Sequence, residues 1–278
     1  MKKVSLIIAS ILLMSSIYAQ DLVSKKGFKI LPETGDYSLG IDARPFLYYA
    51  GNIFNGNVTN ASPDFDFTAP YPMIITGKYF ITDKIAYRGV FRLGMNSITD
   101  KNYVQQDGQS DPLVTVEDKY TYSSTDIALG GGIEYRRGHG RVQGYYGGMA
   151  MLTFGSDKYT YKYGNAHSST NVNPTRTNFG RNSVGGGTWV LEDINGSTFG
   201  FNVFGFIGVE YYVAPKLSIS GEFSYGFGFQ SKGNGKYKLQ SWDAANNAVK
   251  TTEGTQGGNS RFGLDTGVSS ALNINFYF

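Results

Sequence analysis

The end of the chain, Arg261 to Phe278, alternates between apolar and polar side chains. Even-numbered positions from Phe262 to Phe278 are mostly apolar, whereas Arg261, Asp265 and Asn273 stand at odd-numbered positions. Because successive side chains of a strand point to opposite faces, one face of this segment is apolar and the other is polar. The segment exceeds the roughly 9 to 11 residues that a tilted strand needs to cross a bilayer. We therefore predict a membrane-spanning β-strand.

The same alternation recurs in seven earlier segments. They are Tyr37–Tyr48, Met73–Ile81, Ile85–Met95, Thr125–Arg136, Arg141–Phe154, Ser197–Tyr212 and Lys216–Gln230. Short polar connections at Thr82–Lys84, Arg137–Gly140 and Val213–Pro215 predict tight turns. Long polar connections separate the other strands, and we expect them to be surface loops. They run from Tyr48 to Pro72, Asn96 to Ser123, Gly155 to Gly196 and Ser231 to Ser260.

This arrangement predicts an all-β fold, an eight-stranded antiparallel transmembrane β-barrel. Short turns on one side and long loops on the other are typical of outer-membrane barrels, whose short turns face the periplasm. Each unpaired backbone N–H or C=O costs several kcal/mol in hydrocarbon. The last strand must therefore pair with the first.

The charged residues of the predicted strands share the parity that faces away from lipid. An arginine on the lipid face near the midplane costs roughly 2 to 4 kcal/mol, so these side chains must point into the lumen. We interpret them as a structural network of ion pairs, and a narrow conducting path is the alternative. The predicted network comprises Asp42, Arg44, Arg88, Arg92, Asp126, Glu134, Glu210, Glu222 and Asp265.

The N-terminus has the three parts of a secretory signal peptide. Lys2 and Lys3 precede a largely apolar run, and Tyr18-Ala19 precedes the expected cleavage site. We expect residues 1–19 to be the signal peptide, 20–35 a periplasmic lead and 36–278 the barrel.

Composition excludes several functional classes. The chain contains 37 glycines, 21 tyrosines and 19 phenylalanines, a composition that suits a sheet protein with an aromatic surface. Its net charge of +3 is not gathered in a basic cluster that could bind nucleic acid. The chain has no cysteine and only two histidines, His139 and His167. His139 is expected in a turn and His167 in a loop, without a base and nucleophile on a rigid scaffold. We therefore expect no enzyme activity, cofactor or metal site.

The signal peptide, the amphipathic strands, the mixed lumenal charges and the aromatic C-terminus resemble the OmpA/OmpX-type small outer-membrane barrels. The composition, rich in Gly and Tyr, resembles that of the outer-membrane barrels of Bacteroidota. The resemblance implies that Phe276 and Phe278 form a signal for the barrel-assembly machinery. It also implies a location in the bacterial outer membrane, among lipid and lipopolysaccharide. The expected role is structural or interactional, including that of an accessory subunit of an envelope complex; the alternative is a narrow porin-like channel for small or apolar solutes.

The predicted loops differ in charge. Acidic residues prevail in Asn96–Ser123 and basic residues in Ser231–Ser260. These charges suit either contact with lipopolysaccharide head groups or docking of a protein partner. Aromatic residues that could anchor such a partner are Tyr159, Tyr161, Tyr163, Trp189 and Trp242.

Overall fold

The computed structural model describes residues 22–42, 75–185, 187–265 and 271–278. These residues form one 13-stranded sheet in which every pairing is antiparallel. None of the described residues is helical. No helix in this part of the chain is long and apolar enough to cross a membrane. The signal peptide predicted at residues 1–19 lies outside the described residues.

Most of the pairings follow one closed path, which we call the ring. The ring runs from β1 through β2, β3, β4, β5, β8, β9 and β13 and returns to β1. Its strands are β1 (Tyr37–Asp42), β2 (Ile75–Thr82), β3 (Ile85–Gln105), β4 (Thr115–His139), β5 (Val142–Lys162), β8 (Thr198–Ala214), β9 (Leu217–Lys232) and β13 (Ala271–Tyr277). The pairing of the last strand with the first, which the sequence argument requires, is present.

The predicted final strand appears in two parts. β12 (Asn259–Asp265) and β13 both pair with β9, and residues 266–270 between them lie outside the described residues. The three short turns fall close to their predicted positions, because β2 and β3, β4 and β5, and β8 and β9 are each joined by two residues. Lys216, in the β8–β9 turn, has a φ of 57°.

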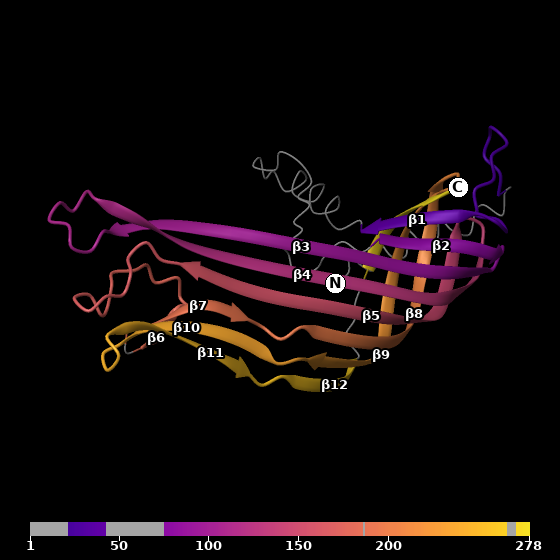
Figure 1. Cartoon of the computed structure of the whole chain (residues 1–278). Helices are drawn as coiled ribbons and strands as arrows, with labels where there is room; N and C mark the ends of the chain where they lie inside the picture. Colours follow the sequence, from indigo (N-terminus) through magenta and orange to yellow (C-terminus); the bar gives the residue numbers. More distant parts are fainter. Residues whose placement is uncertain (1–21, 43–74, 186, 266–270) are drawn as a thin grey trace, which may run out of the picture.

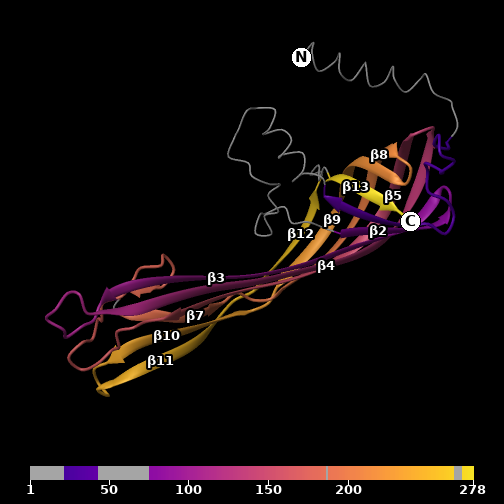
Figure 2. The ribbon, with the colours of Figure 1, turned by 90° about the horizontal axis from the view of Figure 1, so that it is seen from above.

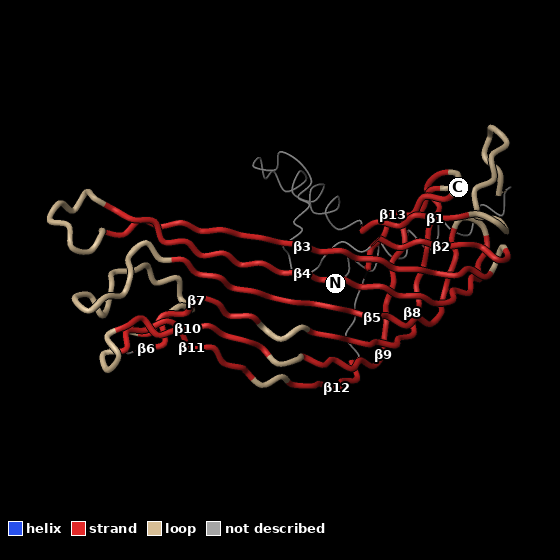
Figure 3. The backbone as a smooth tube through the Cα atoms, in the orientation of Figure 1, coloured by secondary structure: helices blue, strands red, loops and turns tan. Residues whose placement is uncertain are grey.

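The segments predicted as loops contain much of the sheet, so that prediction is wrong. β3, β4 and β5 continue well past the ring and are joined there by β6 (Ser183–Gly185), β7 (Thr188–Ile194), β10 (Gly235–Asp243) and β11 (Ala248–Gln256). We call this protruding sheet the extension. Figures 1 and 3 show it reaching far from the ring, and Figure 2 shows the same projection from above. The remaining predicted loop, from Tyr48 to Pro72, lies outside the described residues.

The sequence analysis did not predict the strands of the extension, because their side chains alternate without forming an apolar face. Tyr120 and Tyr122 lie on one face of β4, and Lys119 and Thr121 lie on the other. Tyr and Thr are strand-forming residues, but a search for an apolar face does not detect them. The extension is therefore a sheet whose alternation separates aromatic from polar residues.

The outside of the ring carries exposed apolar side chains. One row of directly opposed residues crosses six strand pairs, and we call it the apolar belt. It consists of Ile75, Phe91, Leu129, Leu152, Phe201, Phe229 and Phe262, each at least 36% exposed.

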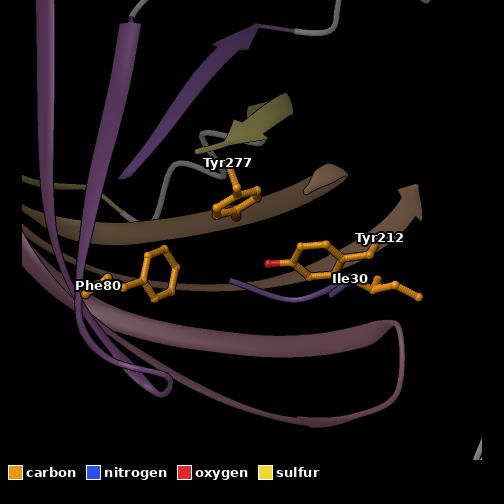
Figure 4. Close-up of a cluster of buried hydrophobic side chains, with 5 residues drawn as sticks. Ile30, Phe80, Tyr212 and Tyr277 are labelled. Atoms are coloured by element: carbon orange, nitrogen blue, oxygen red, sulfur yellow. The ribbon is translucent and has the colours of Figure 1, made fainter. Parts of the chain in front are cut away.

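An apolar cluster inside the ring closes its short-turn end. Ile30 of the N-terminal lead packs with Phe80, Tyr212 and Tyr277, and all four are at most 4% exposed (Figure 4). The lead is held there by its backbone, since the Lys216 N–H donates to the Ile30 carbonyl at 3.2 Å and the Gly35 N–H donates to the Phe80 carbonyl at 2.8 Å. The described part of the predicted periplasmic lead therefore packs against the ring as a plug.

Candidate functional site: a buried charge layer

A layer of ionised side chains lies inside the ring, directly above the cluster that contains Ile30. It brings together three cations and three carboxylates, none more than 6% exposed. These residues are Lys78, Arg88, Arg136, Glu134, Glu210 and Glu222. The layer balances charge, which is the condition under which ionised groups persist away from water.

The pair of Arg88 and Glu222 joins two strands that are not neighbours in the ring. The guanidinium of Arg88 on β3 donates two hydrogen bonds to the carboxylate of Glu222 on β9, at 2.5 and 3.2 Å. Such a bidentate contact fixes the geometry of both groups, and its charge-assisted hydrogen bonds are among the stronger ones in proteins. The contact therefore connects opposite walls of the ring through its interior.

Glu134 stands at the centre of the layer. Its carboxylate accepts a hydrogen bond from Lys78 Nζ at 2.9 Å, and its oxygens lie 3.4 Å from Arg136 Nε and 3.8 Å from an Arg88 nitrogen. Each of the three cations of the layer thus touches this one carboxylate. Its negative charge allows them to lie close together.

Glu210 has the densest set of partners. Its carboxylate pairs with Arg136 and accepts hydrogen bonds from Ser218, Tyr277 and Asn275, the last from Nδ2 at 3.1 Å. These donors come from β4, β9 and β13, so several strands converge on one buried carboxylate. A carboxylate with this many donors is held in a fixed position.

Aromatic rings seal the charge layer on both sides. On the turn side, the Arg136 guanidinium lies 5.2 Å from the centre of the Phe80 ring. On the other side, Arg88 lies 4.5 Å from the Phe206 ring, which packs in a second buried cluster with Val90, Tyr145 and Met149. The interior is therefore stratified into an apolar, a charged and another apolar layer.

Inward glycines make room for the large side chains of these layers. A Cβ at Gly147 would lie 2.0 Å from the Ile133 carbonyl oxygen and 2.6 Å from the Phe206 ring. A Cβ at Gly208 would lie 2.3 Å from the Tyr145 ring. These two glycines thus allow large side chains to fill the interior.

The residues predicted from the sequence fall into three groups. Arg88, Glu134, Glu210 and Glu222 meet in the layer. Arg92 and Asp126 lie farther along the strands, 3.8 Å apart, with the Asp126 side chain 57% exposed. Arg44 and the side chains of Asp42 and Asp265 lie outside what the structure describes.

Sequence reasoning missed Lys78 and Arg136. Arg136 has the same parity as Glu134, but the predicted strand ended there, and Lys78 lies inside the predicted strand Met73–Ile81, directly after Thr76 and Gly77. Their parity alone could have identified both. At the C-terminus, Phe276 and Phe278 are 39% and 72% exposed, whereas Tyr277 between them points inward.

A second polar network holds residues 163–182 against the tip of the extension. Asp118, which is fully buried, accepts hydrogen bonds from the Gly164 N–H at 2.8 Å and the Thr177 N–H at 2.6 Å. Asp107 accepts a hydrogen bond from the Asn171 side chain at 2.6 Å. Burial raises the pKa of Asp107, but the hydrogen bonds from Thr175 and Asn171 lower this pKa by more, so it lies below its ordinary value. These aspartates thus hold a loop in place.

The histidines and loop aromatics lie in structural settings. His139 is exposed at the end of β4, and His167 is buried against Trp189 with ring centres 4.2 Å apart. Tyr161 and Trp189 are each only 2% exposed, so neither is available as a surface anchor for a partner. In the described portion of the chain, no group of three or more His, Asp or Glu side chains could hold a metal ion.

Comparisons with known proteins find matches among solved structures but none by sequence. The chain matches no protein-family model and no curated protein by sequence. Among solved structures, it is similar to the outer membrane protein OprG from Pseudomonas aeruginosa, with a TM-score of 0.32 and 10% identity over 90% of this chain and 98% of that chain.

Proposed function

We propose that this chain is an eight-stranded transmembrane β-barrel of a bacterial outer membrane, whose role is structural and interactional. The observation that carries the proposal is the closed ring with an apolar belt outside and a neutral charge layer inside. Soluble monomers rarely expose an apolar patch larger than a few hundred Å². A belt that crosses six strand pairs suits hydrocarbon instead of water.

The filled interior supports a structural role over conduction. An ion that passes along the ring would have to cross the cluster around Ile30, the charge layer and the cluster around Phe206. At eight strands, a barrel interior is just wide enough for side chains to fill. The narrow porin-like channel is therefore the weaker alternative, and no described contact favours an enzyme.

The extension supports the interactional part of the proposal. It projects from the ring on the side opposite the short turns (Figure 1), and its tip is stiffened by the Asp107 and Asp118 networks. A stiff sheet presents a fixed surface at lower entropic cost than a flexible loop. We propose that this sheet, rather than mobile loops, contacts an accessory envelope partner or the surrounding glycolipid.

Cell fractionation and conductance test the proposal together. The full chain, expressed in a Gram-negative host, is expected in the outer-membrane fraction, extractable only with detergent and lacking residues 1–19 by N-terminal sequencing. Reconstituted in a planar bilayer, it is expected to give no stepwise current. Recovery in the soluble fraction would refute the barrel, whereas a regular single-channel current would refute the structural role alone. Co-purification after mild extraction then tests for a partner.

A further inference from the structure

The outward face of the extension carries three lysines in one row. Lys101 on β3 lies opposite Lys119 on β4, which lies opposite Lys162 on β5. Directly opposed residues have Cβ atoms about 4.5 to 5.5 Å apart, and like charges in such positions destabilise a sheet. The row is therefore unfavourable by itself, and a bound anion would relieve it.

The carboxylates of this face neutralise other lysines. Lys101 Nζ lies 2.9 Å from Glu117, Lys158 Nζ 3.2 Å from Glu192, and Lys238 Nζ 2.9 Å from Glu253. In contrast, Lys119 and Lys162 form no ion pair with any described residue. Lys119 and Lys162 are thus two adjacent lysines of this face without an ion pair.

A shallow depression lies at these two lysines. It has a volume of about 190 Å³ and is lined by Lys119, Lys162 and the threonines of the next row, Thr121 and Thr160. Two ammonium groups and two hydroxyls offer hydrogen-bond donors of the kind that a phosphate group requires. The chemistry of the depression therefore suits a phosphate oxyanion.

The position of the depression indicates where such a phosphate would come from. Lys101, Lys119 and Lys162 share the outward parity of the row Leu93, Ile127 and Phe154, and each lies eight residues beyond its counterpart. Eight residues span about 27 Å of strand, or about 19 Å along the normal at a tilt of about 45°. Measured from that apolar row, the lysines thus lie above a phospholipid headgroup layer of roughly 5 to 7 Å.

We propose that Lys119 and Lys162, with Thr121 and Thr160, bind a phosphate on the sugar portion of an outer-leaflet glycolipid. The inference rests on the proposed function, because it places the lipid-facing surface of the ring in a membrane. The height of the site favours a phosphate on the sugar portion over a phospholipid phosphate. The continuity of the face with the apolar belt favours a lipid neighbour over a free anion.

Binding to purified full chain in detergent, measured by native mass spectrometry, tests this. The probes are lipopolysaccharide with a phosphorylated core, the same glycolipid dephosphorylated, phosphatidylglycerol and inorganic phosphate. The phosphorylated glycolipid is expected to bind roughly tenfold more tightly than each of the others, the gain of one charge-assisted contact. Lys119→Gln with Lys162→Gln should abolish that difference. The matched control, Lys25→Gln with Lys26→Gln on exposed lysines of the lead, should preserve it.

Lys119→Glu separates binding from structure. It places a carboxylate between Lys101 and Lys162, so the extension should become more resistant to urea while glycolipid binding is lost. Equal binding by the Lys119/Lys162 double variant, or equal binding of the dephosphorylated glycolipid or phosphatidylglycerol, would overturn the site. Failure of the wild-type chain to enter vesicles would instead refute the barrel itself, so the two failures are distinguishable.

Discussion

The buried pair of Arg88 and Glu222 offers the sharpest test of the filled interior. Arg88→Met removes both hydrogen bonds to Glu222 and leaves its carboxylate, 6% exposed, without a cation. Breaking a buried pair from one side costs about 3 to 5 kcal/mol. The double variant Arg88→Met with Glu222→Leu removes both charges and keeps the layer neutral. Replacement of a whole buried pair is often neutral, so it should cost far less than the single change.

Urea unfolding in phosphatidylcholine vesicles, followed by far-ultraviolet circular dichroism, measures both effects. With a urea slope of about 2 kcal/mol per M, the single variant should unfold at a urea concentration about 1.5 to 2.5 M lower than wild type. The double variant should recover most of this loss, which gives a large coupling energy between the two sites. If Arg88→Met unfolds with the wild-type midpoint, water reaches the layer and the interior is not sealed. If the double variant is as unstable as the single one, packing and not charge accounts for the loss.

Three further predictions follow from contacts described above. Gly147→Ala should prevent folding or lower stability by at least about 1 to 3 kcal/mol, because its Cβ meets a backbone oxygen; Gly131→Ala, whose nearest neighbour is 3.9 Å away, is the control in the same urea assay. Asp118→Ala leaves two backbone N–H groups unpaired, so limited proteolysis should cut residues 163–182 faster while the ring stays intact. Hydrogen bonds from the backbone and side chain of Thr34 lower the pKa of Asp83 in the β2–β3 turn. Their stabilisation is therefore present at neutral pH and is lost as the pH falls through the lowered pKa, so Asp83→Asn should flatten the acid limb of stability against pH.

The sequence sufficed for the ring and for the face on which each charge lies. Alternation locates a strand wherever one face is apolar, and the cost of an arginine in lipid then decides which face is inward. That reasoning placed Arg88, Glu134, Glu210 and Glu222 on the inner face. It could not pair them, because pairing depends on which strands face each other across the interior.

The extension could not be predicted in the same way. Its strands separate Tyr120 and Tyr122 from Lys119 and Thr121, so neither face resembles a lipid surface. The lysine row likewise exists only through register, since Lys101, Lys119 and Lys162 are far apart in sequence. The plug formed by Ile30 could not be predicted for another reason: the apolar residues of the lead, Leu22, Val23, Phe28, Ile30 and Leu31, form no sustained alternation.

The backbone contact between Tyr37 and Phe278 constrains how the protein is made. The Phe278 N–H donates to the Tyr37 carbonyl at 2.9 Å, and the Tyr37 N–H donates to the Phe278 carbonyl at 3.1 Å. Residues from nearly opposite ends of the polypeptide must meet before the ring has no open edge, and contacts of such high sequence separation form slowly. A variant without β13 would leave one edge of β1 and one edge of β9 unpaired. A deletion at this one strand should therefore open the whole ring.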